Sequence, residues 1–216
     1  RYTPYLKERN PQEILTVASH ILGKGQLSLA KYLFICAKED DPSLDIHNIQ
    51  GFMKHVLERI DLSRDLHFHT KTTIDTLDYS GTDINAGSKV VIAVAGDKKR
   101  ELLSELPVMF SLPRPFQSKL IMPGVVAIAA PKYTSHEETE KQIDLLNEAL
   151  KEDYLEGLPL FILCDDARFT AESVSNFVWV SFTRSNPSHD MYGNNSFTEN
   201  KHWGSKGPLV IDARIK

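Results

Sequence analysis

The sequence has little of what marks a secreted, membrane-spanning or nucleic-acid-binding protein. Only two cysteines, Cys36 and Cys164, occur among 216 residues; each ends an apolar run, which predicts buried, reduced thiols. No apolar run approaches the ~20 residues of a transmembrane helix and no leader opens the chain, so we expect a cytoplasmic protein without a transmembrane segment. No basic block exceeds Lys98-Lys99-Arg100 and the formal net charge is −4, which argues against a nucleic-acid partner.

Motifs for catalysis and for metal binding are also scarce. There is no Gly-x-Ser-x-Gly elbow, and neither cysteine has a base nearby in sequence. His67 and His69 have the spacing of two zinc ligands on one side of a strand, but no third or fourth ligand follows. Gly23-Lys24-Gly25-Gln26 lies between a helix and a strand, so we interpret it as a helix stop and not as a phosphate-binding loop. We expect no metal ligand and no catalytic residue in this chain.

The sequence is rich in regular apolar patterns. With 41% hydrophobic and 25% charged residues, it suits one large α/β domain or two small ones in close contact. Apolar periodicity predicts strands at 32–36, 66–69, 89–95, 124–130, 158–164 and 208–211, and helices at about 10–22, 45–57, 135–151 and 170–182. We therefore expect an α/β fold of mixed sheets with flanking helices.

Two strand-loop-helix units resemble each other within the chain, which predicts an internal duplication of residues 10–97 in residues 120–216. The matching pieces keep their order: Leu33-Phe34-Ile35 with Leu160-Phe161-Ile162, Arg59–Asp65 with Arg184–Asp190, and Gly87-Ser88-Lys89 with Gly204-Ser205-Lys206. Length differences fall in the connections, as in diverged repeats. Chance repetition of apolar strands is the alternative.

Five residues are the candidates for a pocket or a cofactor contact. Asp165 and Asp166 follow a predicted parallel strand, at the edge where ligands of open α/β sheets bind, although loop solvation and capping of the next helix are the more common reasons for such residues. Arg59 and Arg184 end the two matching helices, where an arginine beside a carboxylate such as Asp190 caps carbonyls and holds the outgoing loop.

Aromatic residues predict one core position and one contact surface. We expect Trp179 in the core, on the helix of the second unit. Trp203, with Phe197, Tyr192 and His202, is typical of an interface, where aromatic rings supply contact area at low entropic cost.

The first unit resembles the carboxyl-terminal segment of the UbiD-type carboxy-lyases. The matching residues run in order: Gly23–Gln26, Lys31–Ile35, the acidic stretch to Asp45, Arg59–Asp65, Ile74–Tyr79 and Gly87–Lys89. The second unit resembles the same segment through Asp165-Asp166, Phe182–Pro187 and Gly204–Lys206. Together the two cover most of residues 1–216, which we interpret as one internally duplicated carboxyl-terminal UbiD-like domain.

The resemblance implies that the intact protein is an enzyme of ubiquinone biosynthesis. It would decarboxylate an aromatic or unsaturated carboxylic acid without oxidation, using prenylated FMN, Mn²⁺ and K⁺. In that family the flavin, the metal ligands and the acid-base residues belong to a preceding amino-terminal domain. The carboxyl-terminal domain contributes the homo-oligomer interface and a wall over the cofactor, so we expect this chain alone to be inactive and to bind none of these groups firmly.

One departure from the family pattern keeps alternatives open. Many relatives carry a basic residue that faces the cofactor phosphate where this chain has Leu15 or Thr16. The chain could therefore be a purely structural association module, or an independent small-molecule-binding domain that uses the acidic strand ends. It opens with Arg1, which indicates a fragment or a processed start.

Overall fold

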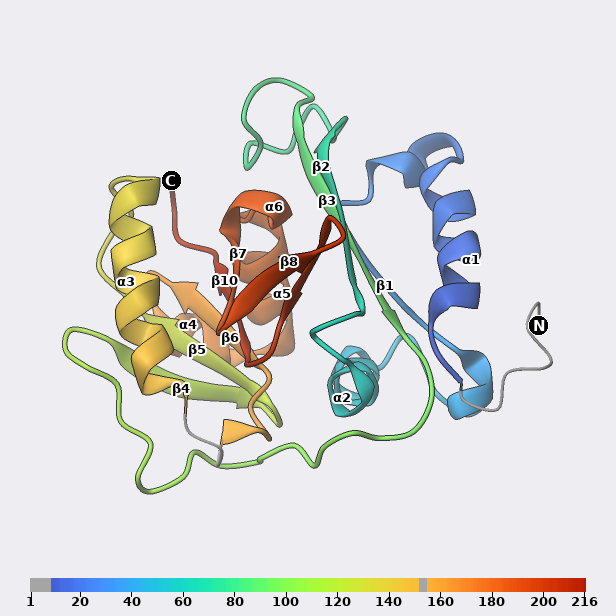
Figure 1. Ribbon diagram of the computed structural model, residues 1–216. Coiled ribbons are helices and arrows are strands. Elements are labelled where there is room, and N and C mark those ends of the chain that lie inside the picture. Colours follow the sequence, from blue (N-terminus) through green and yellow to red (C-terminus); the bar gives the residue numbers. More distant parts are fainter. Residues whose placement is uncertain (1–8, 152–154) are drawn as a thin grey trace.

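The computed structural model describes residues 9–151 and 155–216, which form two larger sheets, with helices between and outside them, and a small two-stranded sheet (Figure 1). The first unit contains α1 (Gln12–Leu22), η1 (Gly25–Leu29), β1 (Tyr32–Cys36), η2 (Lys38–Asp40), α2 (Ile49–Arg59), β2 (Leu66–Thr72) and β3 (Gly87–Val94). The second contains β4 (Gln117–Met122), β5 (Val125–Ala129), α3 (His136–Ala149), β6 (Leu160–Cys164), α4 (Ala167–Glu172), α5 (Val174–Thr183), α6 (Pro187–Asp190), β7 (Met191–Gly193), β8 (Ser196–Glu199), β9 (His202–Ser205) and β10 (Leu209–Asp212). The α/β fold with mixed sheets is confirmed.

The third sheet pairs β8 with β9 in antiparallel fashion. The two larger sheets share one topology at their centres. In the first sheet, of order β1-β3-β2, β3 lies between the parallel β1 and the antiparallel β2. In the second, β10 lies in the same way between the parallel β6 and the antiparallel β7, and the β4–β5 hairpin extends that sheet beyond β6. This agreement supports the internal duplication, which stays a prediction.

The register of the strands corrects one detail of the sequence match. Phe34 pairs with Ile92, which pairs with Leu66, whereas Ile162 pairs with Ile211, which pairs with Met191. Tyr32–Cys36 thus corresponds to Leu160–Cys164, one residue away from the Leu-Phe-Ile match. A shift of one residue exchanges the two faces of a strand. The two strands therefore correspond by the direction in which their side chains point, and not by the identity of the Leu-Phe-Ile residues.

A helical layer lies between the two sheets and one helix covers each outer face (Figure 1). On the outer side of the first sheet, Ala18 of α1 packs on Val91 and Ala93. Across the second sheet, α3 packs through Ile143 and Leu146. The inner faces of both sheets share one core with α2 and α5, because strand side chains alternate between the two faces.

Two of the predicted helices have different limits in the structure. The helix expected from about residue 45 begins at Ile49, because the Asn48 side chain accepts from the Gly51 backbone N–H and caps it there. The single helix expected at 170–182 is two helices, α4 and α5. They are separated by Ser173, whose extended backbone and side-chain bond to the Asn176 N–H start α5.

The two units contact each other in a reciprocal way. The turn after α2 accepts, at the Leu62 carbonyl, a hydrogen bond from the Ser205 N–H of the second unit at 2.9 Å. The turn after α5 donates from the Ser188 N–H to Ser88 Oγ of the first unit at 2.8 Å. Each turn thus contacts the Gly-Ser stretch of the other unit, the pattern of a two-fold interface within one chain.

Candidate ligand groove between the units

A cavity of about 1130 Å³ opens between the two units. It is bounded by the start of β1, by α2, by the loop of residues 75–81, by the end of α5 and by residues 214–216. We call this cavity the groove.

The inner walls of the groove are apolar and rich in aromatic rings. Phe34 and Phe52 come from the first unit, and Val178 and Phe182 from the second. The Phe182 ring centroid lies 4.8 Å from that of Tyr32 and 5.5 Å from that of Phe34. These ring contacts hold the walls in place.

Apolar side chains also surround the mouth of the groove, and they are exposed. Leu77 and Tyr79 are 77% and 89% exposed, and Ile46 and Ile215 are 65% and 64% exposed. Ile49, at the start of α2, is 42% exposed. Contiguous apolar surface of this kind marks an interaction or ligand site.

A buried ion pair lies at the base of the groove. Lys31 Nζ is 2.7 Å from Asp78 Oδ2 and donates to Ser80 Oγ at 2.7 Å. Burial lowers the pKa of Lys31, which the hydrogen bond to Asp78 opposes. Burial acts to raise the pKa of Asp78, but the hydrogen bonds from Lys31 and Ser80 and the charge of Lys31 together outweigh it and hold this pKa below its ordinary value. Each group of the pair thus favours the ionised form of the other, and the two charges are directed at each other.

Beside this pair, the Tyr32 hydroxyl lies 2.7 Å from Ser185 Oγ, which in turn donates to the Ser181 carbonyl. Burial raises the pKa of Tyr32 well above its ordinary value. The phenol thus remains neutral and joins the two units by a hydrogen bond.

A second ion pair lies at the end of α5. Arg184 Nη1 is 3.2 Å from Asp165 Oδ2, which also accepts from the Ile215 N–H at 3.0 Å. The Arg184 guanidinium lies 4.8 Å from the centre of the Trp179 ring. Trp179 is 51% exposed, so the expectation that it lies in the core is wrong: helical spacing could not show that this side chain packs on a cation at the surface.

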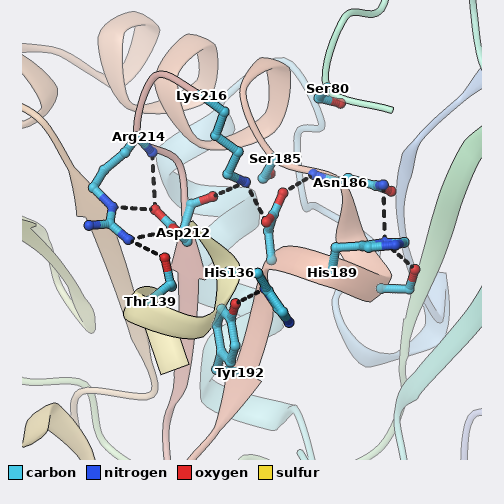
Figure 2. Close-up of polar contacts among 12 residues, drawn as sticks. Ser80, His136, Thr139, Ser185, Asn186, His189, Tyr192, Asp212, Arg214 and Lys216 are labelled. Carbon is cyan, nitrogen blue, oxygen red and sulfur yellow. Dashed lines mark hydrogen bonds and ion pairs between the residues drawn. The ribbon is translucent and has the colours of Figure 1, made fainter. Parts of the chain in front are cut away.

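The last residues of the chain add two further charged pairs (Figure 2). Arg214, 1% exposed, donates to both oxygens of Asp212 at 2.8 Å and to Thr139 Oγ1 at 2.8 Å. Lys216 pairs with Asp190. Burial raises the pKa of Asp190 above its ordinary value, which the Lys216 ammonium opposes.

The structure separates the five candidate residues. Arg184 lines the groove, Asp165 holds Arg184, and Asp190 holds Lys216, another lining residue. Asp166 instead accepts from the N–H groups of residues 168 and 169 and caps α4. Arg59 is buried elsewhere and donates to the Gly96 and His55 carbonyls.

Sequence reasoning missed the pair of Lys31 and Asp78. They lie 47 positions apart in sequence, and a lone lysine before an apolar strand gives no spacing signal. Lys216 was missed for a similar reason, since its partner Asp190 is brought close only when β10 pairs with β7.

The residues at the proposed phosphate contact do not fit that role. Leu15 packs on the outer face of the first sheet, and the Thr16 hydroxyl donates to the Glu13 carbonyl of its own helix. Within residues 9–151 and 155–216 there is no group of three or more His, Cys, Asp or Glu side chains able to hold a metal ion. Neither Leu15 nor Thr16 therefore offers a cation to a flavin phosphate.

The aromatic group around Trp203 lies between the two units. The Trp203 ring packs edge-on against Phe68 at 5.5 Å, and the His202 ring lies 5.5 Å from that of His67. Burial lowers the pKa of His67. The Tyr192 hydroxyl lies 3.2 Å from His136 Nδ1, so its contact is within the second unit. A role of this group in contact with another chain stays a prediction.

Both cysteines are free thiols at corresponding strand ends. Burial raises the pKa of Cys164 to about 11 and also raises that of Cys36, so neither is an activated nucleophile. As for membranes, the described helices include none with the length and apolar character that a bilayer crossing requires.

A comparison with known families assigns the first unit. Residues 5–94 match the model of the 3-octaprenyl-4-hydroxybenzoate carboxy-lyase C-terminal domain. Residues 5–94 belong to the UbiD carboxyl-terminal domain family. The UbiD match ends at the last residue of β3, so it covers one of the two units with the shared strand topology.

Similarity to curated proteins extends beyond this UbiD unit. A protein of Chlamydia trachomatis without a stated activity is 34% identical over 213 residues, which is 98% of this chain and 34% of that protein. A Chlamydia pneumoniae protein, named as one of the subunits of a 4-hydroxybenzoate decarboxylase, is 34% identical over 212 residues, with the same coverage. The chain spans about a third of the length of the curated relatives that it matches.

Proposed function

We propose that this chain is the association and cofactor-covering domain of a prenylated-FMN-dependent decarboxylase. The substrate of the intact enzyme would be an aromatic or unsaturated carboxylic acid, decarboxylated without oxidation in the cytoplasm, in a pathway of the ubiquinone type. The observation that carries this proposal is the UbiD match of residues 5–94, supported by the chlamydial relative that is named as part of a decarboxylase.

In this proposal the chemistry belongs to another part of the protein. Prenylated FMN, Mn²⁺ and K⁺ would be bound by an amino-terminal domain of the same polypeptide. The role of this chain would be to form a homo-oligomer and to close one side of the cofactor site. The paired charges at the groove, Lys31 with Asp78 and Arg184 with Asp165, agree with a supporting role because each is held by an internal partner.

Two preparations test this division: the 216-residue chain, and the full-length product of the gene that encodes it, both expressed with a source of prenylated FMN and supplied with Mn²⁺. We expect the full-length protein to release CO₂ from an aromatic or unsaturated acid and the chain alone to release none. Turnover by the chain alone, or no turnover by the full-length protein across a panel of such acids, would contradict the proposal.

A further inference from the structure

We infer that the groove binds the uncharged hydrocarbon chain of an amphipathic molecule, such as an isoprenoid tail. The site consists entirely of residues of this chain, contributed by both units. Binding is therefore a property that the 216-residue chain should show alone. Only the further step, that the bound molecule is the acid substrate or its decarboxylated product, rests on the proposed function.

The charges of the groove favour a neutral ligand. Six charged residues line it, and five of them are paired: Lys31 and Asp78 with each other, Arg184 with Asp165, Arg214 with Asp212, and Lys216 with Asp190. The sixth charged residue is Asp75, which accepts a hydrogen bond from the Leu77 N–H at 2.8 Å. A carboxylate or phosphate entering the groove would have to compete with these internal anions for the cations, whereas a hydrocarbon leaves every pair intact.

The size of the groove favours a long ligand over a single ring. Its volume of about 1130 Å³ lies above the roughly 300–1,000 Å³ of common small-molecule pockets. A benzoate-sized molecule would leave much of the apolar wall in contact with water. Each further methylene group that is buried should improve affinity by up to roughly fourfold.

The difference in exposure between the walls and the mouth of the groove predicts the orientation of the bound ligand. Phe34 and Phe182 are half-buried in the walls, whereas Leu77 and Ile215 are exposed at the mouth. The chain of the ligand would follow the apolar surface inward, and its polar head would remain in water at the mouth, as amphipathic molecules orient elsewhere.

Dye displacement tests the inference directly. The neutral fluorescent probe N-phenyl-1-naphthylamine would be titrated into the 216-residue chain and then displaced by farnesol and by straight-chain alcohols of increasing length. We expect saturable probe binding, displacement by farnesol, and affinity that rises with the length of the alcohol. Benzoate, which carries a charge and lacks a tail, should displace the probe at least tenfold less effectively than farnesol.

Two exposed positions provide variants that retain the fold. Leu77→Asp and Ile49→Asp place a charge at the mouth of the groove, where the side chains are 77% and 42% exposed. Ile84→Asp is the matched control, since Ile84 is 80% exposed in the same β2–β3 connection but does not line the groove. We expect at least tenfold weaker probe binding for the first two, less than twofold change for the control, and the wild-type circular dichroism spectrum for all three.

Three results would overturn the inference: no probe binding, displacement by benzoate as effective as by farnesol, or probe binding unchanged in Leu77→Asp and Ile49→Asp. If Leu77→Asp abolished self-association and left probe binding intact, the mouth would be a protein contact surface and the inference would also be wrong. The outcome is separable from the proposed function, because decarboxylation by the full-length protein can fail while the chain binds the probe, and the reverse.

Discussion

The pair of Lys31 and Asp78 shows which structural features a sequence pattern can predict and which it cannot. Their side chains are 8% and 17% exposed, and the desolvation cost of burying two charges is offset only while each has its partner. Pattern analysis located the strand that follows Lys31, because apolar runs determine strands. It could not pair a lysine with a carboxylate in a distant loop, because the pairing depends on how the loop returns to β1.

Replacing Asp78 with Asn should strongly destabilise the protein. The change leaves the buried Lys31 ammonium without its counter-charge, and we expect a loss of about 3 kcal/mol in the free energy of unfolding. Urea denaturation measures it. The control is Asp83→Asn, an exposed position in the same loop, which should change stability by less than about 0.5 kcal/mol; equal effects of the two variants would contradict the structural role of the pair.

The same pair predicts a dependence of stability on pH. The pKa of Asp78 is held below its ordinary value of 3.8, so its stabilising contribution is present above about pH 4 and is lost as the pH falls through the lowered value. The difference in unfolding free energy between the wild type and Asp78→Asn should therefore be constant from pH 5 to 7 and shrink below pH 4. A difference that persists unchanged to pH 2 would show that Asp78 does not act through its charge.

At the scale of elements, the positions of strands and helices were predictable and their registers were not. The strands at 32–36 and 158–164 were predicted because continuous apolar runs of this length mark buried strands. The one-residue offset between the two units was missed because both faces of these strands carry apolar side chains, so Leu, Phe and Ile fit either face. The break at Ser173 was missed because the apolar pattern continues across it, and only the capping bond to Asn176 reveals it.

The turns that follow α2 and α5 contain the same carboxylate clamp. Asp65 accepts from the Asp61 N–H at 2.8 Å, and Asp190 from the Asn186 N–H at 2.6 Å. The sequence match of Arg59–Asp65 with Arg184–Asp190 indicated these turns but assigned the clamp to the arginines. In the structure each carboxylate holds its own turn and meets a different cation, Arg64 or Lys216.

Because the two clamps are equivalent, Asp65→Ala and Asp190→Ala should have similar effects. Each removes a charged acceptor from a backbone N–H in a buried turn, and we expect each to cost about 2–3 kcal/mol of unfolding free energy in urea. Asp144→Ala, at an exposed position of α3, is the control and should cost less than about 0.5 kcal/mol. A cost at one clamp and none at the other would contradict their equivalence.

At the scale of the whole molecule, the two units form one body with a shared core, and the groove lies between them. Composition predicted an α/β fold, since alternating apolar strands and amphipathic helices allow few other arrangements. The groove was not predictable, because it arises from how the second unit packs on the first. Its walls come from segments as far apart as Phe34 and Ile215.

The central claim, that this chain is an association domain, is tested most directly by its molar mass in solution. Multi-angle light scattering at micromolar concentration, after size-exclusion chromatography, measures that mass without any assumption about the cofactor or the substrate. The account predicts a discrete multiple of the 24.4 kDa of one chain. A single species of 24.4 kDa at every concentration from one to one hundred micromolar would contradict it.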